Sequence, residues 1–238
     1  MNKRIIKTII WLSIFSMAMA FMESAVVIYL RALYYPDGFT FPLRIIDSNI
    51  AVTEFFREIA TIIMLAVIGI IAGRKSIEKF VFFIFCFAIW DIFYYVFLKI
   101  ILNWPESFFT WDILFMVPVT WVGPVLAPVI NSMTMIILAV CIIFFIEKNA
   151  KVRVCILSWT LLIAGSLIII FSYTQEYMQF MMQRFSYREM FGISYNNEVL
   201  KYACTFIPQH FNWWIFWTGE IMYVAAIIIL CFRNKKTC

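Results

Sequence analysis

Six long apolar stretches restrict the possible folds of this chain more than any other feature of its sequence. Each can supply the roughly 20 residues that an α-helix needs to cross a bilayer, and none has the short alternating pattern of a barrel strand. The chain is 64% hydrophobic and 14% charged, against about 25% charge in soluble domains. We predict an all-α integral membrane protein with one polytopic domain over residues 1–238. The six predicted transmembrane helices cover about residues 8–30, 50–73, 80–102, 129–146, 152–172 and 212–232.

A proline-containing stretch interrupts the helical pattern before the fourth predicted helix. Residues 108–128 are too apolar for a solvated loop, and three prolines break them: Pro118, Pro124 and Pro128. Each proline removes a backbone donor and disfavours helix at the residue before it. Irregular backbone at membrane depth is tolerated where protein or a cavity covers it. We therefore predict a short re-entrant or interfacial segment on the outer face.

The stretch before the last helix is predicted to be a long outer loop. Residues 173–210 are polar, but Met178, Met181, Met182 and Phe185 recur at helical spacing. Apolar residues on one helical face are typical of a helix that lies on the membrane surface. We expect an amphipathic surface helix within this loop.

Lys and Arg are distributed unevenly between the two ends of the predicted helices. Twelve of the nineteen fall on the side of the amino terminus, and the positive-inside rule places that side in the cytoplasm. An even number of helices brings both termini to the same side. We therefore expect a multi-pass protein of the cell membrane with both termini in the cytoplasm, and a bacterial inner membrane as its setting.

Acidic side chains inside the predicted helices are the strongest functional signal. At about 1.5 Å per residue they all fall in the outer half of the membrane, at most roughly 15 Å deep. Charged groups at this depth face the bundle interior or a water-filled cavity. On the second helix Arg57 lies at helical spacing from two acids, which predicts one inward polar stripe. The acids are Glu23, Glu54, Glu58, Asp91 and Glu220.

Several neighbours of these acids are further candidates for the same site. Tyr94 and Tyr95 share a helical face with Asp91, and Asp112 follows a Trp-Pro-Glu-Ser turn. These groups could bind an ion or a substrate together with the carboxylates.

Two more candidates lie at the outer end of the last helix. Trp217 shares a face with Glu220, where an aromatic ring could attract a cation, and His210 lies just before that helix. The alternative for Trp217 is an ordinary aromatic belt at the membrane surface. The alternative for His210 is an interfacial residue without chemistry.

The balance of charge predicts a cationic ligand. The five acids face mainly Arg57, and several carboxylates in one low-dielectric site cannot all ionise without another cation. Protons, a metal ion or a cationic solute would supply the missing charge. The structural alternative is that Arg57 pairs with Glu54 or Glu58 and that the polar groups only join helices.

Known cofactor and enzyme motifs are missing from the sequence. It contains no GxSxG, HExxH or phosphate-loop pattern, and its single histidine, His210, excludes bis-His haem. A divalent cation is still possible as a ligand, because carboxylate oxygens can coordinate one. No basic run is long enough to follow a nucleic-acid backbone. We therefore expect contact with the lipid bilayer and no nucleic-acid partner, while oligomeric state and cofactor stay unassigned.

Three functions agree with these patterns. The first is binding or transport of a small cation, proton or cationic solute through an outward-facing carboxylate-rich pocket. The second is an intramembrane enzyme acting on a lipid-like substrate at the outer leaflet, with Glu58 or Asp91 as general base and Arg57 stabilising an anion. The third is a non-catalytic membrane subunit or assembly factor. The inner half of the membrane holds few polar residues, which weighs against transport.

Cysteine labelling tests the topology. In a background without native cysteines, single cysteines at positions 38 and 190 should react with an impermeant reagent outside sealed cells. A cysteine at position 75 should stay protected, because the positive-inside rule places that turn in the cytoplasm. Reaction at position 75 in intact cells would contradict the six-helix arrangement.

Overall fold

Six helices long and apolar enough to span a membrane make up most of the structure, as predicted from the sequence. The computed structural model describes residues 3–148, 152, 154–190 and 197–235. The six helices are α1 (Lys3–Tyr34), α2 (Ser48–Ala72), α3 (Ser76–Leu102), α4 (Leu126–Lys148), α5 (Ile156–Met182) and α8 (Trp213–Lys235). The shorter elements are β1 (Trp111–Phe115), β2 (Trp121–Pro124), α6 (Tyr187–Met190) and α7 (Asn197–Ala203).

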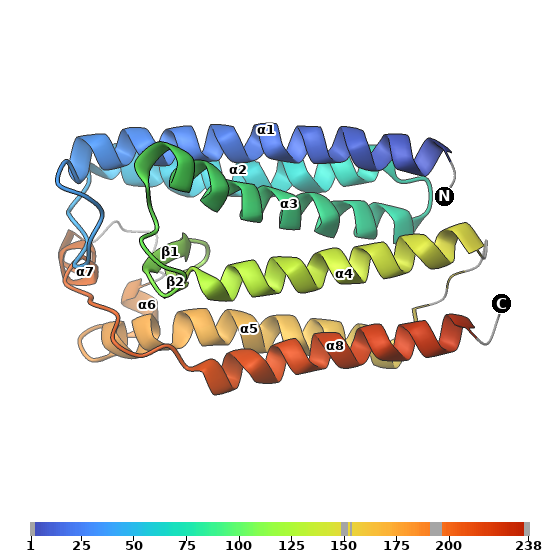
Figure 1. The fold of residues 1–238 in the computed structure, drawn as a ribbon. Helices are drawn as coiled ribbons and strands as arrows, with labels where there is room; N and C mark the ends of the chain where they lie inside the picture. The colour runs from blue at the N-terminus through green and yellow to red at the C-terminus, as the bar shows by residue number, and fades with distance from the viewer. Residues whose placement is uncertain (1–2, 149–151, 153, 191–196, 236–238) are drawn as a thin grey trace.

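The helices form two layers that run side by side (Figure 1). One layer holds α1, α2 and α3, and the other holds α4, α5 and α8, with α3 packed directly against α4. Small residues let α1 and α3 approach closely, because Ser16, Ala20 and Ser24 are all fully buried. The Ser24 hydroxyl donates a hydrogen bond to the backbone carbonyl of Tyr94 on α3 at 3.2 Å. α1 begins and α8 ends at the same end of the bundle.

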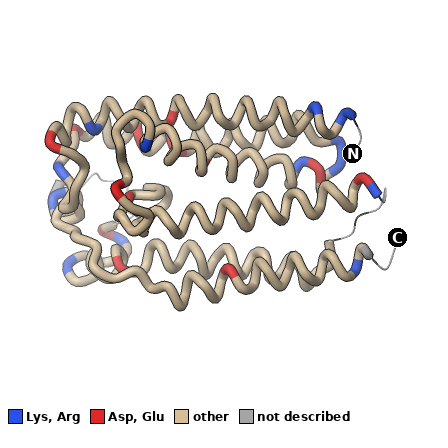
Figure 2. The backbone as a smooth tube through the Cα atoms, viewed as in Figure 1, with Lys and Arg blue, Asp and Glu red and all other residues tan. Residues whose placement is uncertain are grey.

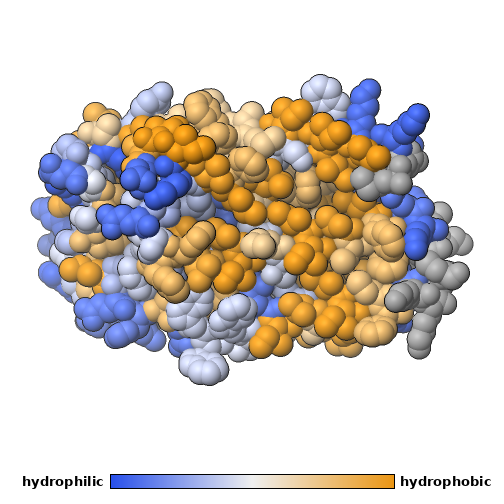
Figure 3. Space-filling view, in the orientation of Figure 1, coloured by the Kyte–Doolittle hydropathy of each residue, from blue (hydrophilic) through white to orange (hydrophobic). Residues whose placement is uncertain are grey.

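The surface of the bundle is that of a multi-pass membrane protein. Hydrophobic residues form a broad band across the middle, and hydrophilic residues gather toward the two ends (Figure 3). Large apolar side chains such as Ile156, Leu167 and Ile221 point outward from this band. Lys and Arg positions gather toward the two ends of the bundle (Figure 2). An exposed apolar surface of this extent is expected where lipid covers the protein.

The proline-containing segment forms a β-hairpin, a structure that the sequence analysis did not predict. The backbone departs from regular helix as expected, but β1 and β2 pair antiparallel, with Asp112 opposite Gly123. A register shift lies between Ile113 and Phe115. The hairpin lies between the two helix layers at one end of the bundle (Figure 1), where backbone that is not helical is tolerated because protein surrounds it. Pro128 lies in the first turn of α4, where a missing backbone donor costs little.

The predicted loop at 173–210 is wrong in its first ten residues. α5 continues without a break to Met182, and Met181 is buried rather than facing a membrane surface. Its partners there include Tyr177 and Phe206 in a small second core. The polar run around Thr174 suggested a loop, but apolar contacts on the other face of α5 stabilise the helix. The described part of the remaining loop contains α6 and α7, while residues 191–196 lie outside the described residues.

A pair of glycines sets the close packing of α5 on α8. A methyl group added at Gly219 would lie 2.9 Å from the carbonyl oxygen of Gly165 and 2.6 Å from Ile169 Cγ1. These distances are too short for a carbon atom, so the two helices would have to separate. This contact holds α5 and α8 together, and β2 packs against α5 and α4 of the same layer.

Substitution Gly219→Ala should therefore lower the thermal unfolding temperature in detergent. Overpacking costs about 1–3 kcal/mol, which exceeds the roughly 1 kcal/mol that alanine gains over glycine in a helix. Val224→Ile adds one carbon on the exposed face of the same helix and should leave the unfolding temperature unchanged. An equal effect of both changes would contradict this packing.

Candidate functional site

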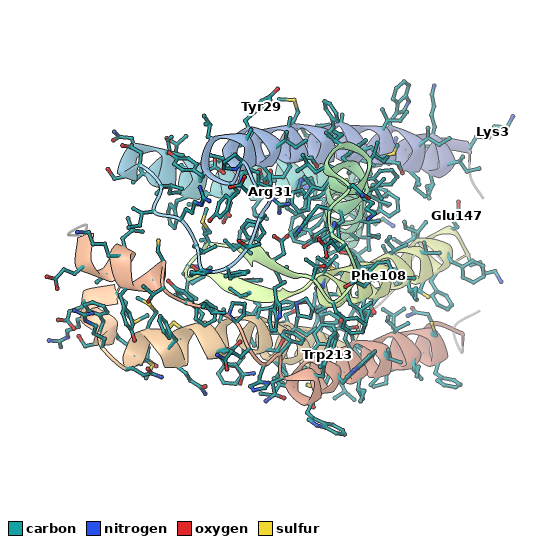
Figure 4. All side chains as sticks on the ribbon, turned by 60° about the vertical axis from the view of Figure 1, so that its left-hand side comes forward. Lys3, Tyr29, Arg31, Phe108, Glu147 and Trp213 are labelled. Carbon is teal, nitrogen blue, oxygen red and sulfur yellow. The ribbon has the colours of Figure 1, made fainter. Side chains whose placement is uncertain are left out.

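A partly open cavity of about 270 Å³ lies at the hairpin end of the bundle. Its walls come from α1, α2, α3, the hairpin, α7 and the loop after α1. α2 and α3 place their inward polar residues on this wall, and the hairpin closes the side toward the second layer (Figure 1). Figure 4 shows Arg31 pointing from α1 toward the hairpin. The cavity lining includes the predicted residues Glu23, Glu54, Arg57, Glu58, Asp91, Tyr94, Tyr95 and Asp112.

Arg57 is held on two sides by carboxylates. Its Nε donates to Glu54 Oε2 at 2.7 Å on the same helix, and its Nη1 donates to Glu23 Oε1 on α1. Thr61 Oγ1 donates to the other oxygen of Glu23 at 3.3 Å. Glu54, Glu58 and Thr61 are all buried, so the polar stripe on α2 faces inward as the helical spacing predicts.

A second ion pair in the cavity lining joins α1 to β1. Arg31 on α1 lies 3.4 Å from Asp112 Oδ1 on β1, and the Tyr95 hydroxyl donates to Asp112 Oδ2 at 3.2 Å. The Arg31 guanidinium stacks on Trp104, 3.7 Å from the ring centre, and also faces Phe39. Sequence reasoning missed Arg31, because an arginine in the last turn of a transmembrane helix is normally drawn to the membrane surface.

Burial determines the acidity of Asp112, which lies outside the six spanning helices. Removal from water raises the pKa of this carboxyl from 3.8 to about 6. Arg31 and the Tyr95 hydroxyl both favour the ionised form and limit the rise. Without these two partners the carboxyl would be neutral over a wider pH range.

Glu58 and Asp91 line the same cavity without a basic partner within 4.0 Å among the described residues. Glu58 Oε2 accepts from the backbone N–H of Met116 at 2.8 Å. Asp91 Oδ2 accepts from the Ser132 hydroxyl on α4 at 2.7 Å. Neutral donors of this kind compensate only part of the cost of removing a carboxylate from water.

Three predicted residues lie away from this cavity. Glu220 is buried in α8 and accepts from Thr134 Oγ1 at 2.8 Å. Trp217 is half-exposed on the same helix. His210 lies in a shallow polar hollow beside Glu176, whose carboxylate accepts its backbone N–H at 3.1 Å. The structure therefore places Glu220 away from the other four predicted acids, while Asp112 joins those four in the cavity lining.

The geometry offers no ready site for a metal ion. Among the described residues, no three His, Cys, Asp or Glu side chains converge in a way that could hold one. The cavity carboxylates are instead divided between two arginines and two neutral donors.

No family model, curated protein or solved structure matches the chain. The class is therefore defined by the fold alone, as a polytopic helical membrane protein. Its function has to be argued from the cavity and its charges.

Stability should depend on pH through Asp112. Because its pKa is higher in the folded state than the ordinary value of 3.8, the folded protein binds this proton more tightly than the unfolded chain does. Stability should therefore fall as the pH rises from 3.8 to about 6. The measurement is the unfolding temperature of wild type and Asp112→Asn across this range.

In Asp112→Asn the fall of the unfolding temperature between pH 3.8 and about 6 should disappear. The variant should also be less stable overall, because it loses the ion pair with Arg31. Asp37→Asn is the matched control, because Asp37 is fully exposed outside the cavity and pairs only loosely with Arg44 at 3.9 Å. A slope that is the same in wild type and Asp112→Asn would assign the pH dependence to another group.

Proposed function

We propose that this membrane protein binds a small organic cation in the outward-facing cavity. The observation that carries the proposal is that Glu58 and Asp91 face the cavity without a basic partner among the described residues. A ligand with an ammonium group would supply the positive charge that these carboxylates lack.

The count of charges along the cavity supports this proposal. Five carboxylates and three arginines line it, but Arg44 belongs to the exposed rim and pairs with Asp37. Of the remaining two, Arg57 is shared by Glu23 and Glu54, and Arg31 pairs with Asp112. The two carboxyl groups left without a basic partner are therefore Glu58 and Asp91, where burial weakens screening by solvent.

The apolar part of the lining favours an organic cation over a hydrated ion. Trp90, Tyr94, Phe115 and Tyr177 all line the cavity, and aromatic faces attract ammonium groups within about 6 Å. A volume of about 270 Å³ lies just below the range of roughly 300–1,000 Å³ for ligand pockets. The ligand should therefore be small, with a cationic head and a short apolar body.

The other half of the bundle favours binding over passage. Its core is built from apolar side chains such as Leu12, Leu65, Phe82 and Ile142, all buried. A transported cation would need polar groups along this part of its route. The orientation of the cavity toward the outside rests on the uneven distribution of Lys and Arg in the sequence.

The enzyme hypothesis loses one of its supports. It requires Arg57 to stabilise an anion, but Glu54 and Glu23 already occupy this guanidinium from two sides. A purely structural role explains these ion pairs, yet it gives no reason for the two unpaired carboxylates beside an open cavity. Cation binding accounts for both sets of residues.

Tetramethylammonium chloride is a suitable probe for this site. It should raise the unfolding temperature of the wild type relative to sodium chloride at equal ionic strength, because a ligand that binds only the folded state stabilises it. At a concentration of 100 times Kd the gain is about 2.7 kcal/mol. Neopentyl alcohol, a neutral molecule of similar shape, should give a much smaller shift.

Variants separate ligand binding from structural roles. Glu58→Gln and Asp91→Asn should fold and lose the tetramethylammonium shift, while Glu106→Gln, on the exposed outer loop, should keep it. Arg57→Ala should lower stability with or without the probe by about 3–5 kcal/mol, because it leaves two carboxylates unpaired. A wild type that responds equally to both salts would leave only the structural role.

A further inference from the structure

A second polar cluster lies within the layer formed by α4, α5 and α8, apart from the cavity. At its centre is Glu220 on α8, whose side chain is 2% exposed. One carboxylate oxygen accepts from Thr134 on α4, and the other, Oε1, has no hydrogen-bond partner among the described residues. A buried carboxylate oxygen without a donor is costly in a low-dielectric interior.

Other buried polar atoms of this region also lack partners. They are the Tyr173 hydroxyl on α5, Asn131 Oδ1 one turn from Thr134 on α4, and the indole N–H of Trp121, whose ring stacks on Tyr173. Tyr173 is only 4% exposed. The set contains both donors and acceptors, which a metal ion cannot satisfy together. Water can bridge such a mixed set, because it donates and accepts.

We propose that Glu220 is the centre of a hydrated proton-binding site that communicates with the cavity through Tyr173 and Asp91. The Tyr173 hydroxyl is close enough to both Asp91 and Glu220 to interact electrostatically with each of them. Asp91 itself lines the cavity. A proton can therefore pass from solvent in the cavity to Asp91, and then through Tyr173 and bridging water to Glu220 Oε1.

Each relaying oxygen in this path accepts one proton and releases one, so only Glu220 changes its charge. The proton comes from solvent at the cavity mouth and forms the new O–H bond at Oε1. The titratable groups that face Glu220 are Tyr173 from α5 and Tyr223 on α8, which shares a 2.7 Å hydrogen bond with Ser166. α4 presents the neutral Thr134 and Asn131, and no Lys or Arg of the described residues lies within 4.0 Å.

Infrared difference spectroscopy on the full chain in lipid nanodiscs tests this site without any ligand. Acid-minus-alkaline spectra of the wild type should contain a protonated-carboxyl band that is lost in Glu220→Gln and kept in Glu106→Gln. In Thr134→Val the band should shift to higher frequency, because its hydrogen-bond donor is gone. The Thr134→Val variant keeps the carboxyl group, so it can test the assignment of the band even if Glu220→Gln fails to fold.

The rate of hydrogen–deuterium exchange at the same band tests the route. Tyr173→Phe removes only a hydroxyl without a hydrogen-bond partner in the described protein, so the variant should fold, and exchange should slow about tenfold. A dry structural cluster predicts that Tyr173→Phe folds more stably and exchanges at the wild-type rate. That result, or a band unchanged in both Glu220→Gln and Thr134→Val, would overturn the proposal. The outcome does not depend on whether tetramethylammonium binds.

Discussion

The ion pair between Arg57 and Glu23 is the interaction on which the cavity depends most. α1 and α2 each pack along α3 and touch one another only sparsely, so a strong polar contact is needed to fix their relative position at membrane depth. Arg57 supplies it by joining Glu23 on α1 to Glu54 on its own helix. A guanidinium suits this role because its donors form a rigid fork that stays charged when buried. The contact stabilises the α1 and α2 walls of the cavity and pairs Arg57 with two carboxylates. Glu58 and Asp91 are left to interact with other partners.

Helical spacing alone predicted the inward face of α2 correctly, because a charged stripe cannot face lipid. The sequence analysis also placed Glu220 correctly within the last helix, but it did not predict which neighbours its side chain faces. Rise per residue gives a position along the helix axis, whereas the neighbour it faces depends on how six helices are arranged. Glu220 faces α4 and α5 rather than the cavity.

Arg31 and the hairpin were missed for related reasons. An arginine near a helix end normally extends to the membrane surface, but the carboxylate of Asp112 on β1 and the ring of Trp104 keep Arg31 buried. The strand partner was itself hidden, since the segment carries no alternating pattern and its prolines suggested only an interruption of helix. Each of the two features explains the other: the hairpin brings Asp112 under α1, and Arg31 compensates the charge that the hairpin buries. Such mutual dependence between distant segments cannot be read from either one alone.

Asp91 connects the two proposed sites, and its position explains why they would influence each other. Its carboxylate faces the cavity, accepts from Ser132 on α4, and lies within electrostatic range of Tyr173. A cation bound in the cavity would stabilise the charged form of Asp91, and a proton on Asp91 would weaken the binding of that cation. The two ligands would therefore compete at one carboxylate, and by linkage each would lower the affinity of the other by the same factor. Because the opposite half of the bundle has an apolar core, this competition would take place entirely on the side of the membrane to which the cavity opens.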